Sequence, residues 1–304
     1  MVGVTENRFR DNYEPWIQAR FYGFRGENMD DNLIHEYEKI LNSDVSNEND
    51  IQEYLEEHSQ IIPLPILENH NLNMNVVISK LKLGNEFITD FAYLTKSSIN
   101  WKLVLMELEN PHKRIFKQGS RIEFTAAFNN AIDQISSWKV YLSENEKQIL
   151  RQIAKLRQPL ETNPMNYGFV LIYGRRNEFE DSEKRRKFLA QKENETGIKI
   201  MTYDSLITHY TNNVGIDCEK IILSQHGEQG FKIKKLPKGP IYTSIFGYLP
   251  QDYIEVDKLQ EKRLKAEGYE MDEWRQGYSL YSNEKKATDS LLKKKIKFGC
   301  DKFS

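Results

Sequence analysis

The sequence predicts an α/β fold in which helices flank a central mixed β-sheet, and three patterns lead to this prediction. The first is a β-hairpin with arms at residues 87–94 and 101–109, rich in β-branched and aromatic or long apolar residues. The second is the nearly all-apolar run at residues 167–173, which is typical of a strand buried on both faces. The third is the order strand, helix, strand from residue 167 to residue 204, which implies parallel pairing through a right-handed crossover.

Helices are expected before the first strands. Residues 1–29 are polar and aromatic, and we interpret them as an arm. An amphipathic helix is expected from Asp30, and a second helix with Ile51, Leu55 and His58 on its buried side ends before Pro63. Residues 74–80 (MNVVISK) form a candidate strand that precedes the hairpin, whose tip is expected at residues 96–98.

Further helices are expected between the hairpin and the buried strand. A polar loop after residue 111 leads to a helix at residues 120–142, which carries an apolar stripe. Ser143 and Glu146 have the spacing of a capping box, which predicts the start of another helix. After the buried strand, a charged helix is expected near residues 181–194, followed by a short strand (IKIMTYD) at residues 198–204. Tyr203 and Asp204, at the end of that strand, are assigned to turn structure.

The character of the chain changes beyond about residue 211. Short strands are expected at residues 220–224 and 231–234, and a helix at residues 259–269. The lysine-rich end from residue 285 fits either a solvated helix face or a phosphate-binding tail. The predicted organisation is an N-terminal arm and helix at residues 1–47, a core domain at residues 48–212 and a C-terminal accessory region at residues 213–304.

Composition excludes several classes of protein. The formal net charge is −2, so any surface for nucleic acid must come from local basic patches. Cys218 and Cys300 are far apart and lack CxxC spacing, which excludes a disulfide framework and a cysteine zinc site. No apolar run approaches the roughly 20 residues of a membrane span, and the start lacks the apolar core of a signal peptide. We therefore expect a cytoplasmic protein with no membrane partner.

Three acidic residues are the most informative feature of the hairpin. Side chains alternate along a strand, so Glu107 and Glu109 share one face of the second arm. If the hairpin is symmetric about its tip, Asp90 lies opposite roughly residues 105–107, on that same face. Like charges placed opposite each other destabilise a sheet. A divalent cation bound among the three carboxylates would remove the repulsion.

The order of these residues resembles the PD-(D/E)XK nuclease superfamily and, more specifically, the Shedu anti-phage defence family. Asp90 is followed after 16 residues by Glu-x-Glu and then by a helix that carries Gln134. The resemblance covers roughly residues 50–210. It rests on the stretches ITDF, LVLMELENP, FTAAFNNAIDQISSW, YGFVLIYGRR and IKIMTYDSL. It implies a restriction-endonuclease-like core, a divalent-metal-dependent DNA endonuclease or nickase, and a homo-oligomer.

The resemblance also assigns roles to individual residues. Asp90 and Glu107 match the two acids that bind the catalytic metal, which is Mg²⁺ or Mn²⁺. Gln134, with Trp138 four residues on, matches a Gln-x-x-x-Tyr element, in which Gln orients a carboxylate or contacts the substrate backbone. The alternative for Gln134 is a helix-edge amide bonded to local backbone.

Glu109 departs from the superfamily pattern, because the usual residue at this position is Lys. A glutamate there would act as a general base for the attacking water or help to hold a second cation. Alternatively, the missing positive charge is restored by Lys113, Lys117 or Arg121, or the site only binds its ligand.

Basic residues near these motifs are candidates for contacts with DNA phosphates, namely Arg121, Arg175 and Arg176. The alternative for Arg175 and Arg176 is an ion pair with Glu178, Glu180 or Asp181. Three functional hypotheses follow: a DNA nuclease, a nuclease-like module that binds nucleic acid or a phage component without cutting, and a scaffold that holds a structural cation.

Overall fold

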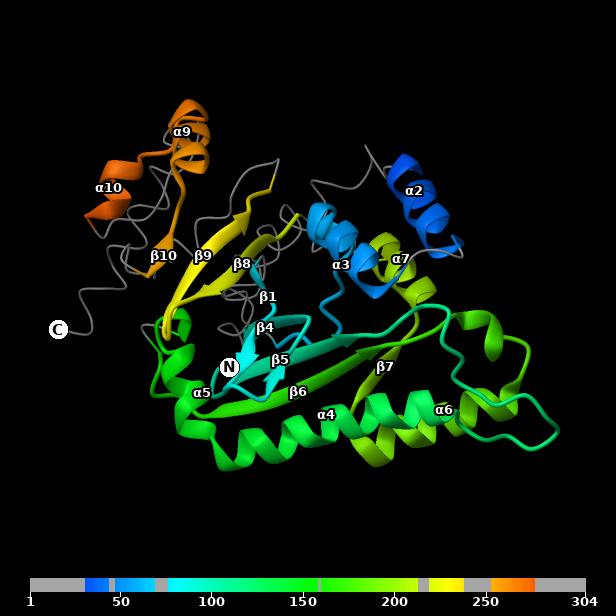
Figure 1. Cartoon of the computed structure of the whole chain (residues 1–304). Coiled ribbons are helices and arrows are strands. Elements are labelled where there is room, and N and C mark those ends of the chain that lie inside the picture. The colour runs from blue at the N-terminus through cyan, green and yellow to red at the C-terminus, as the bar shows by residue number, and fades with distance from the viewer. Residues whose placement is uncertain are drawn as a thin grey trace, which may run out of the picture. The chain divides into compact units, whose positions relative to one another are not determined.

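The computed structural model describes residues 31–43, 47–68, 76–157, 160–212, 219–237 and 253–276 (Figure 1). In these residues an eight-stranded mixed sheet has the strand order β10-β9-β8-β1-β4-β5-β6-β7, and β2 and β3 form a separate pair. The predicted α/β class with a central mixed sheet and flanking helices is confirmed. The predicted N-terminal arm and the lysine-rich end lie outside the described residues.

The chain divides into two compact units, which are described here one at a time. The first unit consists of Met1–Pro65, Met106–Ser137 and Phe169–Lys220, and the second of Ile66–Leu105, Trp138–Gly168 and Ile221–Ser304. Strands β5 (Trp101–Leu108) and β6 (Met165–Ile172) and helix α4 (Ala126–Glu144) contribute residues to both units. The domain boundaries predicted after residues 47 and 212 stay a prediction.

The first unit contains a parallel strand pair and its crossover helix. Val170 pairs with Lys199 and Ile172 with Met201 in a parallel register, which confirms the predicted β6–β7 pairing. Its elements, besides parts of β5, α4 and β6, are α2 (Asp31–Leu41), α3 (Glu48–Glu57), η1 (Ser59–Ile61), η3 (Arg176–Glu178), α6 (Glu183–Thr196), β7 (Lys199–Met201) and α7 (Tyr203–Asn212).

The helix ends of this unit follow from local sequence. Asn47 caps α3, because its side chain accepts hydrogen bonds from the N–H groups of Asn49 and Asp50. Ser182 caps α6 by accepting from the N–H of Arg185, and Gly197 ends the helix in the left-handed region, at φ 63°. The observed bounds of α6 therefore agree closely with those of the charged helix predicted near residues 181–194.

The second unit shows why the sheet is mixed. Strand β1 (Val76–Ser79) pairs antiparallel with β4 (Phe91–Lys96) and parallel with β8 (Ile221–His226). Strand β8 continues into an antiparallel hairpin with β9 (Gly230–Lys235). The other elements, besides parts of β5, α4 and β6, are β2 (Lys82–Leu83), β3 (Phe87–Ile88), α5 (Glu146–Gln152), η2 (Lys155–Arg157), β10 (Ile254–Glu255), α9 (Lys258–Ala266) and α10 (Met271–Arg275).

The first arm of the predicted hairpin is not one continuous strand. Phe87 and Ile88 pair with β2, and the sheet strand β4 starts only at Phe91. Between them the Thr89 N–H donates to the Leu81 carbonyl (2.9 Å), and the Asp90 carbonyl accepts from the N–H of Lys80 (3.0 Å). Lys80 has φ 53°, in the left-handed region that non-glycine residues rarely adopt. The alternation of side chains carries no information about this local turn.

The tip of the hairpin also differs from the prediction. Lys96 is a buried strand residue, and its Nζ donates to the Ser97 carbonyl (2.7 Å). The connection therefore runs over residues 97–100, where the Ser97 N–H donates to the Asn100 carbonyl (2.9 Å).

Two predicted helix starts are wrong and one predicted strand is too long. Helix α4 begins at Ala126 rather than at residue 120, because the Thr125 hydroxyl accepts from the N–H of Phe128 (3.1 Å). No capping box forms at Ser143, since α4 continues through that residue and the N-cap of α5 is Asn145. Strand β7 ends at Met201, because α7 begins at Tyr203.

Candidate active site

Glu107 is a buried carboxylate near the end of the central strand β5. Only 7 % of the residue is exposed. Gln134 on α4 donates a hydrogen bond from Nε2 to Glu107 Oε1 (2.5 Å). The structure thus gives Gln134 the carboxylate contact that the family resemblance implies, in place of the alternative bond to local backbone. The hydrogen bond fixes one oxygen of Glu107 without neutralising its charge.

Glu109 follows directly after β5 and is held by its backbone. Its N–H donates to the Ile172 carbonyl (3.0 Å), and its own carbonyl accepts from the hydroxyl of the buried Tyr203. The carboxylate forms an ion pair with Lys113. Lys113 was one of three cations predicted to restore the missing positive charge. The other two, Lys117 and Arg121, pair with Glu123 at 2.8 and 3.3 Å.

Asp90 belongs to the second unit. It is 4 % exposed, and Lys80 Nζ lies 2.5 Å from its Oδ1. Lys80 was not predicted as a partner, since ten residues and a turn separate it from Asp90. A shared metal between Asp90 and Glu107 stays a prediction.

The loop that carries Lys113 is anchored by Glu178, a residue whose role the sequence did not indicate. The carboxylate of Glu178 accepts from the N–H groups of Ile115 (2.8 Å) and Phe116 (3.1 Å). Gly174 allows a close approach to the same loop, because a Cβ at this position would lie 3.0 Å from the Lys113 carbonyl oxygen. In the sequence, only this glycine, directly after the buried strand, could have indicated that a loop packs closely here.

Comparison with known families identifies the chain. Residues 45–207 match the family model of the Shedu protein SduA, C-terminal region, and the match covers more than half of the 304 residues. The chain belongs to this Shedu family. Membership points to a role in anti-phage defence. No curated protein matches the chain.

The Shedu match contains every residue that the sequence singled out for the site. Asp90, Glu107, Glu109 and Gln134 all lie between residues 45 and 207. The candidate phosphate contacts Arg121, Arg175 and Arg176 lie there too.

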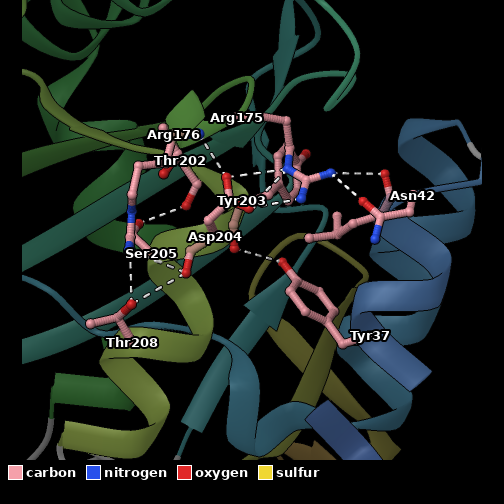
Figure 2. Close-up of polar contacts among 10 residues, drawn as sticks. Tyr37, Asn42, Arg175, Arg176, Thr202, Tyr203, Asp204, Ser205 and Thr208 are labelled. Atoms are coloured by element: carbon pink, nitrogen blue, oxygen red, sulfur yellow. Dashed lines mark hydrogen bonds and ion pairs between the residues drawn. The ribbon is translucent and has the colours of Figure 1, made fainter. Parts of the chain in front are cut away.

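Arg175 and Arg176 converge on Asp204 (Figure 2). Arg175 donates from Nε (3.0 Å) and Nη2 (2.8 Å) to Asp204 Oδ1, and from Nη1 to the Leu41 carbonyl (3.1 Å). The N–H of Arg176 donates to Asp204 Oδ2 (2.7 Å). The alternative of an ion pair with Glu178, Glu180 or Asp181 is therefore wrong. Arg175 pairs with Asp204, and the Arg176 side chain donates to the Thr208 hydroxyl (2.8 Å). Their common partner, Asp204, lies in the first turn of α7. It is far from both arginines in sequence, so proximity along the chain could not have predicted the contact.

Asp204 titrates differently from an exposed carboxyl group. Burial raises its pKa, but the hydrogen bonds from the Arg175 guanidinium and the Arg176 N–H outweigh this effect, so the pKa is lowered from its ordinary value. Asp204, predicted to be a turn residue, instead lies in the first turn of α7 and orients Arg175. A role of the two arginines in DNA binding stays a prediction.

Two features are absent from the residues that the structure describes. No group of three or more His, Cys, Asp or Glu side chains there is arranged to hold a metal ion. No helix in that part of the Shedu chain is long and apolar enough to cross a membrane.

Proposed function

We propose that this chain is a divalent-metal-dependent DNA endonuclease or nickase of the PD-(D/E)XK type, acting in bacterial anti-phage defence as a homo-oligomer. The observation that carries the proposal is the hydrogen bond from Gln134 to the buried carboxylate of Glu107. Metal-ligating carboxylates are commonly oriented in this way by a neutral outer-shell donor.

The acidic residues have the chemistry that a magnesium or manganese ion requires. Asp90 and Glu107 supply carboxylate oxygens, the preferred ligands of both ions. Both residues are largely excluded from water, which strengthens their interaction with a cation. The proposal assigns the metal to these two side chains. When bound, the ion would activate water and polarise a phosphodiester.

Glu109 and Lys113 together would replace the single lysine that is usual at this position in the superfamily. The Glu109 carboxylate would accept the proton of the attacking water as a general base. Lys113, which forms the ion pair with Glu109, would supply positive charge near the phosphate. Hydrolysis adds one water across a P–O bond and leaves a hydroxyl group and a phosphomonoester.

DNA contacts are assigned to the three arginines. The Arg121 side chain is 87 % exposed and is well placed to meet a phosphate from solvent. The donors of Arg175 are directed at Asp204, Leu41 and Asn42, so this arginine would contribute its positive charge to DNA binding rather than a direct hydrogen bond.

The deciding experiment is cleavage by the purified full chain. With Mg²⁺ or Mn²⁺ we expect cleavage of supercoiled, linear or single-stranded DNA, and EDTA should stop it by removing the metal. Products are separated on agarose and denaturing gels. If all three substrates stay intact with both ions, the enzyme hypothesis fails.

A second candidate function is a nuclease-like module that binds nucleic acid or a phage component without cutting. It is favoured by the two lysines, since Lys80 lies 2.5 Å from Asp90 and Lys113 pairs with Glu109. An ammonium group then sits beside each of these carboxylates. This function requires gel retention of DNA that persists in EDTA, weakens with salt and is accompanied by no cleavage.

Replacing Gln134 with leucine should lower metal-dependent cleavage by about 10- to 100-fold, the usual cost of losing an outer-shell partner. The defect should shrink as Mn²⁺ is raised, because a poorly oriented Glu107 binds metal more weakly. Rates are measured over a metal titration.

The matched control for this change is Gln191→Leu. Gln191 donates to Glu195 in a similar amide–carboxylate pair (2.7 Å), but on the exposed surface of α6. Equal rates for Gln134→Leu and Gln191→Leu at every metal concentration would remove Gln134 from the site.

A further inference from the structure

The first unit contains a cleft that the nuclease proposal does not use as a whole. Its volume is about 550 Å³, within the usual range of small-molecule sites. Its lining is strongly basic, with four cationic side chains and one carboxylate. The cations are Lys113, Arg114, Arg175 and Arg185, and the carboxylate is Glu178. We call this the basic cleft.

The carboxylate of the cleft, Glu178, is already hydrogen-bonded to backbone N–H groups. Both Glu178 oxygens accept backbone hydrogen bonds from the loop, at 2.8 and 3.1 Å. Arg114 Nε lies 3.8 Å from Glu178 Oε2, which is beyond hydrogen-bond length. Almost half of the Arg114 side chain is exposed. Its N–H donors are therefore directed at another acceptor or at solvent.

Arg185 is held in place by contacts that leave part of its guanidinium available. Nη1 donates to the Glu178 carbonyl (2.6 Å), and the guanidinium carbon lies 5.2 Å from the centre of the Phe116 ring. A cation–π contact holds a guanidinium beside the ring and leaves its other N–H groups for a ligand. Arg114 and Arg185 thus present fixed or solvent-facing donors to one cleft.

The charges around the cleft do not cancel. Glu109 and Asp204 pair with Lys113 and Arg175, and Glu178 offsets one of the two remaining arginines. An unbalanced cation inside a concave surface attracts anions, because low-dielectric walls focus its field. Guanidinium groups bind phosphate oxygens bidentately and so favour phosphate over a simple halide.

We propose that the basic cleft binds the phosphate groups of a nucleotide-sized ligand, through Arg114 and Arg185 with Lys113 as a shared cation. The phosphate group belongs either to a free nucleotide or to a nucleic-acid strand. The proposal requires neither a metal ion nor bond cleavage, so it goes beyond the nuclease function.

Lys113 connects the basic cleft to the candidate active site. It lines the cleft, and its Nζ forms the ion pair with Glu109. A phosphate bound in the cleft competes with Glu109 for the same ammonium group. Removal of the Glu109 charge therefore strengthens phosphate binding, whereas removal of an arginine weakens it. These opposite signs distinguish a phosphate site from a purely structural cluster.

The test is calorimetric titration of the full chain with pyrophosphate and with ATP, in EDTA and low salt. Arg114→Gln and Arg185→Gln should each weaken binding by at least about tenfold, the cost of losing a charge-assisted hydrogen bond. Glu109→Gln should tighten binding by about threefold or more. Lys187→Gln on the same helix as Arg185 is the control, because the Lys187 side chain is 77 % exposed and pairs with Glu183. Thermal melts check that each variant is folded.

Three results would overturn the proposal: no saturable binding below about 10 mM, equal weakening by Lys187→Gln, or no tightening by Glu109→Gln. A single-stranded oligodeoxynucleotide without terminal phosphates identifies the source of the phosphate. Arginine-dependent binding of the oligonucleotide that is tighter than that of ATP assigns the cleft to a strand, and the reverse order assigns it to a free nucleotide. Because metal is absent throughout, failure of the nuclease proposal does not affect the result.

Discussion

Glu107→Gln is expected to lower the rate of DNA cleavage by about 10³-fold or more in Mg²⁺. Glu107 is a buried acid whose position is fixed by Gln134, which donates to its Oε1 at 2.5 Å. A glutamine retains an oxygen that accepts this hydrogen bond, so the local structure should survive. It loses the negative charge that a metal ligand needs. A loss of about 4 kcal/mol of transition-state stabilisation corresponds to about 10³ in rate and lies within the contribution of a metal ion.

The design of this experiment separates loss of charge from loss of fold. Cleavage is timed under single-turnover conditions, and urea denaturation is run on the same protein preparation. Glu183→Gln removes one carboxylate from the exposed start of α6, where Glu183 pairs with Lys187, and should cleave at the wild-type rate. Binding of Mn²⁺, followed by paramagnetic resonance, gives a readout that does not depend on turnover. If Glu107→Gln cleaves DNA and binds Mn²⁺ as well as the wild type does, Glu107 is not a metal ligand.

Local patterns were sufficient for much of the fold. The apolar run that became β6 carries its own signal in continuous hydrophobicity, and α6 (Glu183–Thr196) starts and ends within two residues of the charged helix predicted at residues 181–194. The parallel β6–β7 pairing then follows from chain order alone. The contact between Gln134 and Glu107 could be predicted for a different reason. The family resemblance implies that these two motifs, far apart in sequence, lie together at one site.

Partners fixed by tertiary structure could not be predicted in this way. Asp204 binds Arg175 across 29 residues, although Glu178 and Asp181 are much nearer in sequence. The strand break at residues 89–90 lies opposite Lys80, whose left-handed backbone no propensity favours and whose N–H donates to the Asp90 carbonyl (3.0 Å). In each case the deciding term is a long-range hydrogen bond or ion pair, and hydrophobic periodicity contains no information about it.

Asp204→Asn is expected to lower the free energy of unfolding by about 2 kcal/mol at pH 7. The asparagine can present only one oxygen, so an amide N–H group faces either the Arg175 guanidinium or the N–H of Arg176. Arg175 also loses the partner of its charge, with only 25 % of its side chain exposed to water. Removing one member of a partly buried pair leaves the other charge without compensation. Urea denaturation measures the difference, and Asp181→Asn, a change at an exposed position, serves as the control.

The pH dependence of this difference tests its electrostatic origin. The folded-state pKa of Asp204 is lowered by its arginine contacts, so the wild-type carboxylate contributes stability above its unfolded pKa of about 3.9. That contribution is lost as the pH falls through the folded-state pKa, because the protonated group can no longer pair with Arg175. The gap between wild type and Asp204→Asn should therefore be constant from pH 7 to about pH 5 and should narrow progressively below about pH 4. A gap that stayed constant down to pH 3 would assign the effect to shape rather than to charge, and Arg175 would then owe its orientation to the Leu41 and Asn42 contacts.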